Sequence, residues 1–113
     1  MSAELTEDQT LIVETARAFA QEKLRPNAAR WEEEGLDRGV LQELASLGFA
    51  GIYVQEEHGG SGLSRLDAAL IFEELSRGCV ATAAFLSIHN MCAWMSDSFG
   101  ADDQRAAWLP KLV

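Results

Sequence analysis

The glycines and prolines of this amino-acid sequence are confined to a few points, and apolar residues recur at helical spacing between them. Only nine glycines and two prolines occur in 113 residues. Apolar segments bounded in this way are typical of helices that bury one face. Hydrophobic residues make up 48% of the chain, which is enough for a packed core. The pattern therefore predicts a single all-α domain over residues 1–113, with about five to six helices.

Capping residues and helix stops predict where these helices begin and end. Thr6 and Gln9 form a capping box at the start of the first expected helix. Ser64 and Asp67 have the same spacing at the start of a later helix. Pro26 marks either a break or the first turn of a short second helix. The expected helices cover residues 6–25, 26–34, 37–47, 64–78, 80–99 and a last segment from about 102.

Two segments between the expected helices are irregular. Residues 49–54 are apolar and partly β-branched, and we expect an extended, buried connector there. Residues 55–62 carry three glycines within four positions, which favours backbone conformations that other residues avoid. The motif lacks the pattern of a phosphate-binding loop and is interpreted as a turn that lets helices pack closely. In the helix before these segments, Val40, Leu44 and Leu47 form the expected buried stripe.

The segment 80–99 is the most apolar of the chain, and a helix of this kind is normally central in a bundle. Four of its residues share one face at spacings of three, four and seven: Ala84, Ser87, Ile88 and Met91. Two interpretations of this face are open. On the pattern alone, ordinary core packing is favoured over one wall of an apolar ligand pocket. His89 and Asn90 interrupt the apolar run and need hydrogen-bond partners, at a neighbouring domain or a helix end.

The charge balance is strongly acidic, with 18 Asp and Glu against nine Lys and Arg, a formal net charge of −9. This balance argues against nucleic acid or an anionic membrane surface as the main partner, because both bind clustered cations. No run of about 18 apolar residues is present, so no membrane-spanning segment is predicted. Residues 1–9 lack the basic and apolar regions of a secretory signal or a transit peptide.

Residues that carry chemistry are few and scattered. His58 and His89 lie on different elements, and no nucleophile–base arrangement follows from spacing. Cys79 and Cys92 are too few for a disulfide scaffold or a four-ligand metal site, and both are expected to be buried free thiols. The acidic runs 32–34 and 56–57 are expected at the surface. The pattern thus predicts no catalytic residue and no metal site.

The chain ends in apolar residues, with no polar tail after Leu112 and Val113. C-terminal segments usually fray into polar residues. Two origins of this ending are open: the chain was cut at a domain boundary, or its last segment is docked. We favour the cut.

Four segments together resemble a known family. They are L-T-E-D-Q at 5–9, L-G-F-A-G-I-Y-V-Q-E-E-H-G-G-S-G-L-S at 47–64, F-E-E-L-S-R-G-C at 72–79 and S-F-G-A-D-D-Q-R at 98–105. They resemble the N-terminal helical domain of acyl-CoA dehydrogenases, which is an orthogonal helical bundle. The stretch S-I-H-N-M-C-A-W-M at 87–95 is similar to the short branched-chain, isobutyryl-CoA dehydrogenase-like members. His58 and Ala101 depart from the family pattern.

The resemblance implies a FAD-dependent α,β-dehydrogenation of a short or branched-chain acyl-CoA thioester. In the family, a glutamate removes the α-proton, the flavin takes the β-hydride, and an electron-transfer flavoprotein accepts the electrons. Family chains continue into a middle β-domain and a C-terminal helical domain, which hold the glutamate and most FAD contacts and which we expect to be absent here. The resemblance therefore assigns no catalytic or cofactor-binding residue to this chain, and it implies a homotetramer for the complete enzyme.

The same resemblance makes the pocket-wall interpretation the favoured one. Ala84, Ser87, Ile88 and Met91 match positions that flank the acyl tail in relatives. We expect a bacterial cytoplasmic enzyme, or one of the mitochondrial matrix if the source is eukaryotic. Two alternatives stay open: a stand-alone helical interaction module without catalysis, and a related acyl-CoA oxidase or flavin monooxygenase.

Overall fold

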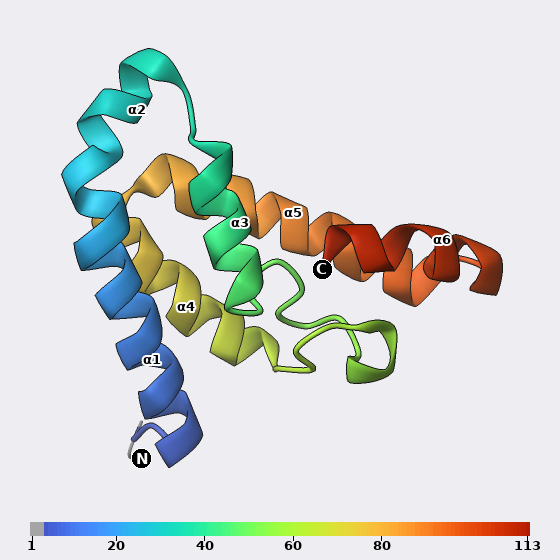
Figure 1. Cartoon of the computed structure of the whole chain (residues 1–113). Coiled ribbons are helices and arrows are strands. Elements are labelled where there is room, and N and C mark those ends of the chain that lie inside the picture. The colour runs from blue at the N-terminus through green and yellow to red at the C-terminus, as the bar shows by residue number, and fades with distance from the viewer. Residues whose placement is uncertain (1–3) are drawn as a thin grey trace.

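The computed structural model describes residues 4–113, and every regular element in that range is helical (Figure 1). The α-helices are α1 (Glu7–Phe19), α2 (Ala28–Glu34), α3 (Arg38–Ser46), α4 (Arg65–Gly78), α5 (Val80–Phe99) and α6 (Asp102–Leu112). A π segment, η1 (Ala20–Leu24), and a 3-10 segment, η2 (Arg25–Asn27), join α1 to α2, and a further 3-10 turn, η3 (Glu56–His58), lies in the glycine-rich loop. The predicted all-α bundle is confirmed.

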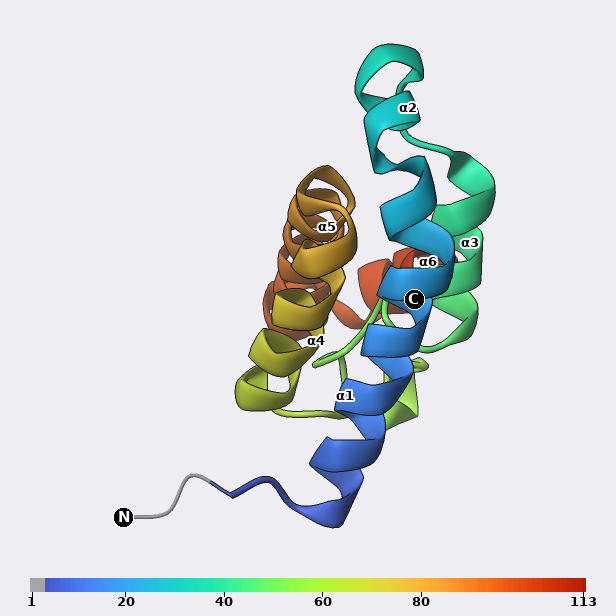
Figure 2. The same ribbon diagram turned by 90° about the vertical axis from the view of Figure 1, so that its left-hand side faces the viewer.

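The helices form a flat body of 43 × 41 × 19 Å. The segments α1, η1 and α2 follow one another as a long bent rod, which packs with α4 (Figures 1 and 2). Helix α4 turns directly into α5, and α6 folds back against the C-terminal half of α5. Within residues 4–113, no helix is both long enough and apolar enough to cross a bilayer.

Helix bounds follow the capping residues closely. The capping boxes of Thr6 with Gln9 and of Ser64 with Asp67 are both formed, as predicted. Gln9 Nε2 also donates a hydrogen bond to Asp67 Oδ1 at 3.1 Å, so the two helix starts are joined to each other. The bounds of the most apolar helix, α5, are those expected from the sequence. Pro26 lies in η2, directly before α2, so the chain bends there without leaving the helical form.

The main core lies between α1, α3, α4 and α5. Its fully buried apolar side chains are Ala16, Ala20, Leu24, Leu44, Ile52, Ile71 and Leu75. The end of α4 approaches η1 so closely that a side chain at Gly78 would lie 2.6 Å from the backbone oxygen of Ala20. Only glycine therefore allows this close contact between α4 and η1.

Residues 49–54 are buried as predicted, but the expected extended conformation is wrong. The segment is a series of turns, and its carbonyl groups accept backbone hydrogen bonds from residues 61–63. Gly60 makes this return possible, since a Cβ atom there would lie 2.2 Å from the oxygen of Val54. The glycine-rich loop thus packs against the connector. A second correction concerns Leu47, which the spacing predicts in the buried stripe of the third helix. It is 43% exposed, and α3 ends at the residue before it.

Asn90 fastens this connector to α5. Its side chain is fully buried, and its Oδ1 accepts a hydrogen bond from the amide of Ile52 at 2.7 Å. Its Nδ2 donates to the carbonyl oxygens of Phe49, at 2.8 Å, and of Leu86, at 2.9 Å. The connector has no helix or strand to satisfy these backbone groups, so the amide side chain replaces that regular pairing.

We predict that Asn90→Ala lowers the free energy of unfolding by about 3 kcal/mol, because two buried backbone groups lose their partner. Urea denaturation followed by circular dichroism measures the change. Ser98→Ala on the exposed side of the same helix is the matched control and should change stability by less than about 0.5 kcal/mol. Equal losses in the two variants would contradict the role given to Asn90.

A second prediction concerns the carboxyl group of Asp67. The backbone amide of Ser64 donates to it at 3.0 Å and lowers its pKa below the ordinary value of 3.8, and Gln9 acts in the same direction. A lowered pKa in the folded state stabilises the fold above the unfolded pKa and ceases to do so as the pH falls through the folded value. Asp67→Asn should therefore cost about 0.5 kcal/mol at pH 7 and progressively less below about pH 4.

Urea unfolding between pH 2 and pH 7 tests this expectation. Glu57→Gln, an exposed carboxylate in the loop, is the control and should change stability equally little at every pH. A cost of Asp67→Asn that grows as the pH falls would show that the sign is wrong.

Candidate functional site

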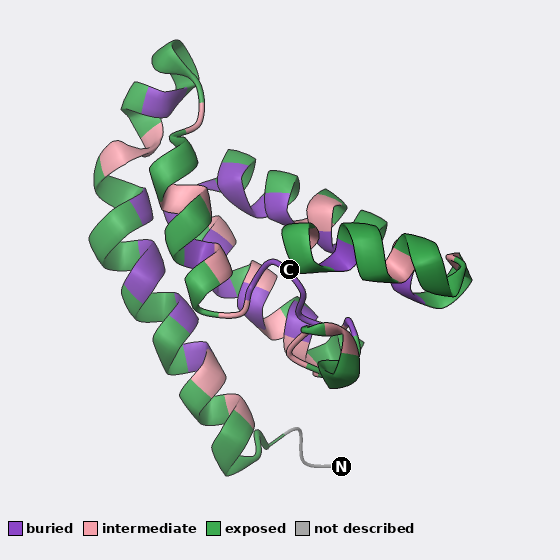
Figure 3. Ribbon diagram, turned by 45° about the vertical axis from the view of Figure 1, so that its right-hand side comes forward, coloured by how far each residue is buried: buried purple, intermediate pink, exposed green. Residues whose placement is uncertain are grey.

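Helix α5 has two faces of opposite exposure, which Figure 3 shows as buried and exposed residues along the same ribbon. One face packs against α4, the connector and α6, and its buried residues are Thr82, Ala83, Leu86, Asn90, Ala93 and Asp97. The other face is open to solvent among residues 4–113 and carries large exposed apolar side chains: Val80, Phe85, Ile88, Met91, Met95 and Phe99. We call this second surface the outward face of α5.

The prediction that α5 is central to the bundle is therefore wrong for half of its circumference. Its sequence is apolar on nearly all sides, but the described residues cover only one side. Exposed apolar surface of this extent on one helix is typical of a surface that meets another molecule or domain.

The four residues that the sequence singled out lie together on the outward face. Ala84 is exposed, Ile88 is 58% exposed and Met91 is 45% exposed, whereas Ser87 is half-buried. Ser87 Oγ donates to the carbonyl oxygen of Ala84 at 2.9 Å, so its hydroxyl group is satisfied within the helix. Core packing is therefore the wrong interpretation within this chain. The four residues form an open apolar strip, and they line neither the groove described below nor the pocket beside His58.

Polar contacts with the connector and the glycine-rich loop fix the orientation of this strip. In the middle of α5, the Asn90 side chain bonds to the backbone of the connector, as described above. Near its end, the buried carboxylate of Asp97 contacts His58 Nδ1 and accepts a hydrogen bond from the amide of Gln55 at 3.1 Å. His58, which departs from the family pattern, thus holds the glycine-rich loop against α5. Rotation of α5 about its axis would break both sets of contacts.

The partners of the polar residues within α5 belong to this domain. His89 Nε2 donates to the carbonyl oxygen of Leu112 at 2.6 Å, which is the helix end that the sequence suggested as one possibility. Asn90 points the other way, into the core beside the connector. Sequence reasoning required partners for both residues but could not locate those outside α5, because they lie more than 20 positions away.

The remaining chemical groups are structural or exposed. Glu74 is buried and bound by Arg17 through two hydrogen bonds, of 3.2 and 3.0 Å, which raise the pKa of Arg17 further. Cys79 is buried as expected, but Cys92 is exposed, because it lies on the uncovered side of α5. The acidic runs at 32–34 and 56–57 are exposed as predicted. No cluster of three metal-ligating side chains occurs within residues 4–113.

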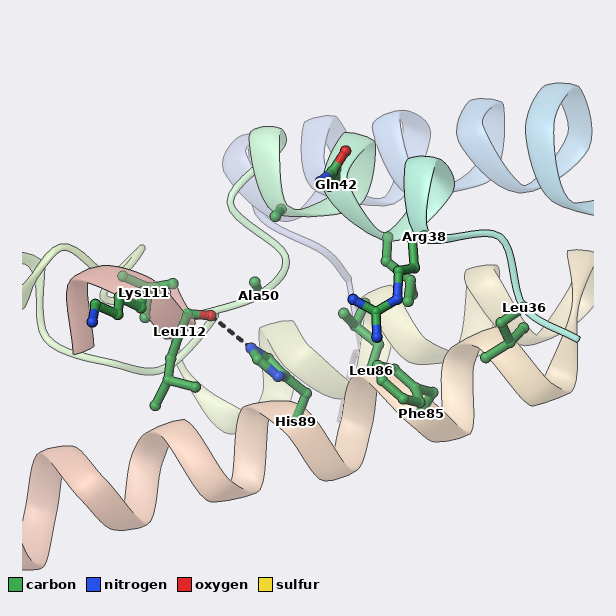
Figure 4. Close-up of a pocket in the computed structure, with 12 residues that line it drawn as sticks. Leu36, Arg38, Gln42, Ala50, Phe85, Leu86, His89, Lys111 and Leu112 are labelled. Carbon is green, nitrogen blue, oxygen red and sulfur yellow. Dashed lines mark hydrogen bonds between the residues drawn. The ribbon is translucent and has the colours of Figure 1, made fainter. Parts of the chain in front are cut away.

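A groove that sequence reasoning missed lies between α3, α5 and the end of α6 (Figure 4). It has a volume of about 540 Å³, and mainly apolar side chains line it. Phe85, Leu86 and His89 border it from α5. Phe85 also belongs to the outward face, so the groove adjoins that face, but none of the four residues of the strip lines it. Its walls come from residues between 36 and 113, and no local motif could have indicated it.

Comparison with known proteins identifies the family. The family profile described as "Acyl-CoA dehydrogenase, N-terminal domain" matches residues 6–113. The chain belongs to this family, as the sequence motifs indicated.

Individual relatives are similar over nearly the whole chain. The chain is 54% identical to the mitochondrial isobutyryl-CoA dehydrogenase of Dictyostelium discoideum, over 99% of this chain and 27% of that protein. The structure of butyryl-CoA dehydrogenase from Megasphaera elsdenii superposes with a TM-score of 0.87 at 32% identity, over 99% of this chain and 30% of that one. A FAD complex of PigA gives 0.90 at 30% identity, over 100% and 30%. The chain therefore spans less than a third of the length of each.

We predict that the isolated 113-residue chain self-associates through the outward face of α5, because exposed apolar patches promote association. Replacing Ile88 and Met95 together by Gln should shift the sedimentation-velocity distribution toward monomer at high concentration. Leu11→Gln, which removes an apolar side chain that is 64% exposed on α1, is the control and should leave association unchanged. A wild-type chain that stays monomeric at high concentration would contradict this prediction.

Proposed function

We propose that this chain serves as the N-terminal helical domain of a FAD-dependent acyl-CoA dehydrogenase. The middle β-domain and the C-terminal helical domain would lie in parts of the protein outside these 113 residues. Family membership supports the proposal, and so do the names of the relatives, which include an isobutyryl-CoA and a butyryl-CoA dehydrogenase. The observation that carries it is the apolar strip on α5, a surface oriented by the fold and left without a partner in the described residues.

The contribution of this chain is binding rather than proton or hydride transfer. Neither buried carboxylate is free to act as a base, because Glu74 is held by Arg17 and Asp97 by His58 and Gln55. The reaction removes an α-proton and a β-hydride from the acyl group, and FAD supplies the hydride acceptor. The outward face of α5 carries no Lys or Arg that could bind the FAD pyrophosphate, so these residues fit the acyl group and not the cofactor.

The strip would form one wall of the acyl pocket. Ala84 and Ser87 are small and leave room beside the helix, whereas Ile88 and Met91 project apolar bulk. A pocket bordered by such bulk is shallow and favours a short or branched acyl group over a long one. The similarity to an isobutyryl-CoA dehydrogenase supports the same substrate class.

The other partners follow from the family. Electrons would pass to an electron-transfer flavoprotein, and the complete enzyme would be a homotetramer. The phosphates of CoA would bind outside this acidic domain. A bacterial protein would act in the cytoplasm, and a eukaryotic one in the mitochondrial matrix. The Dictyostelium relative is named as mitochondrial.

A second candidate is a flavoprotein of the same architecture that acts on a different substrate, such as an oxidase or a monooxygenase. The similarity to the FAD complex of PigA, which is not named as a dehydrogenase, keeps this candidate open. A stand-alone interaction module would instead use the strip to bind another protein. The intact mass and visible spectrum of the natural protein distinguish a flavoenzyme of either kind from the stand-alone module. A mass several times 12.4 kDa with a flavin spectrum supports a flavoenzyme, and a mass near 12.4 kDa without flavin overturns it.

We predict that Met91→Ala in the complete enzyme shifts the ratio of kcat/KM toward longer straight-chain acyl-CoA substrates, by about ten-fold, because removing this side chain deepens the pocket. Initial rates with a series of straight-chain thioesters of increasing length measure the shift. Leu66→Ala on α4, an equally simple truncation of an exposed residue away from the strip, is the control. An unchanged chain-length profile would exclude Met91 from the pocket wall.

A further inference from the structure

The groove between α3, α5 and α6 differs in charge from the rest of the molecule. Its lining contains Arg38 and Lys111 but neither Asp nor Glu, although acids outnumber bases two to one in the chain. Within residues 4–113, neither Arg38 nor Lys111 forms an ion pair or a side-chain hydrogen bond, whereas Arg17, Arg77 and Arg105 all pair with carboxylates. Two free cations thus border a groove of a protein with surplus negative charge.

The rest of the lining is apolar. Leucine, alanine, valine and phenylalanine side chains make most of the wall, and the ring of Phe85 is half exposed in it. Figure 4 shows the Arg38 side chain extending from α3 toward Phe85 and Leu86 on α5, so that its guanidinium group lies beside the apolar wall. The volume of about 540 Å³ is in the range of small-molecule sites. The groove therefore combines the planar guanidinium group of Arg38, a cationic hydrogen-bond donor, with an apolar lining.

We propose that this groove binds a small free carboxylate with an apolar tail, such as a medium-chain fatty acid. The carboxylate would pair with Arg38, because two N–H groups of a guanidinium can donate to the two oxygens of one carboxylate. The apolar tail would lie along Phe85, Leu86 and Leu112. Lys111 adds positive potential at the other end. None of the four residues of the strip lines the groove, so the two sites are distinct. Lys111, Leu112 and Val113 do line it, and the domains of the proposed function would follow Val113, so the proposal requires that those domains leave the groove open.

Isothermal titration calorimetry on the intact protein tests the proposal, with sodium octanoate as the probe. Octyltrimethylammonium has the same tail with a positive head and should bind more weakly than octanoate. Arg38→Gln should weaken octanoate binding by at least about three-fold, since a partly exposed ion pair is lost. Gln42→Glu places a carboxylate one helical turn from Arg38, where it competes for the guanidinium group, and should weaken octanoate binding in the same direction.

Two further variants test whether octanoate binds in this groove and nowhere else on the chain. Lys23→Gln removes an exposed cation outside the groove and should leave octanoate affinity unchanged, which controls for the general loss of positive charge. Met91→Gln changes the strip on α5 and should also leave it unchanged. Loss of affinity in Met91→Gln but not in Arg38→Gln would locate octanoate on the strip and overturn the proposal. Equal affinity for the two probes would reduce the groove to a non-specific apolar surface and overturn it as well.

Discussion

The arrangement of the domain depends on the hydrogen bonds of Asn90. Residues 49–54 leave the helical form, and turns alone cannot satisfy their backbone groups in the core. The amide of Asn90 supplies a donor and an acceptor to that segment from the middle of α5. Because the glycine-rich loop pairs with the same segment, α5, the connector and the loop are held as one unit. The side of α5 that faces outward is therefore determined by a contact on its opposite side.

The two faces of α5 differ in what they contact: the inner face packs within the domain, and the outer face is exposed to solvent in the described residues. The inner face combines small and polar residues that fit closely against α4 and the connector, whereas the outer face carries large apolar side chains that stay exposed in the described residues. Exposed apolar area costs free energy in water, so a sequence that retains it has another use for it. The polar contacts of Asn90 and Asp97 add to this argument, since they bond α5 to other segments and resist the rotation that would bury the outer face.

Local signals predicted the helices, because capping boxes and terminal glycines act over three or four residues. Both capping boxes and both bounds of α5 were found in this way. The spacing of Ala84, Ser87, Ile88 and Met91 showed that they share a face, but periodicity cannot distinguish a face toward the core from one toward solvent. The connector and the partners of Asn90 could not be predicted, since they depend on contacts across about 40 positions. The groove between α3, α5 and α6 was missed for the same reason.

The distribution of charge links the two surfaces of α5. Several acidic residues lie in the first turn of a helix, where the helix dipole and solvent accept them, as with Glu7, Asp8 and Asp102. The outward face carries neither sign of charge among its large side chains, so it suits an uncharged apolar group. The groove on the adjacent face carries unpaired positive charge and suits an anion with an apolar part. One helix therefore borders two apolar surfaces, and only the groove has side chains that could pair with an anionic group.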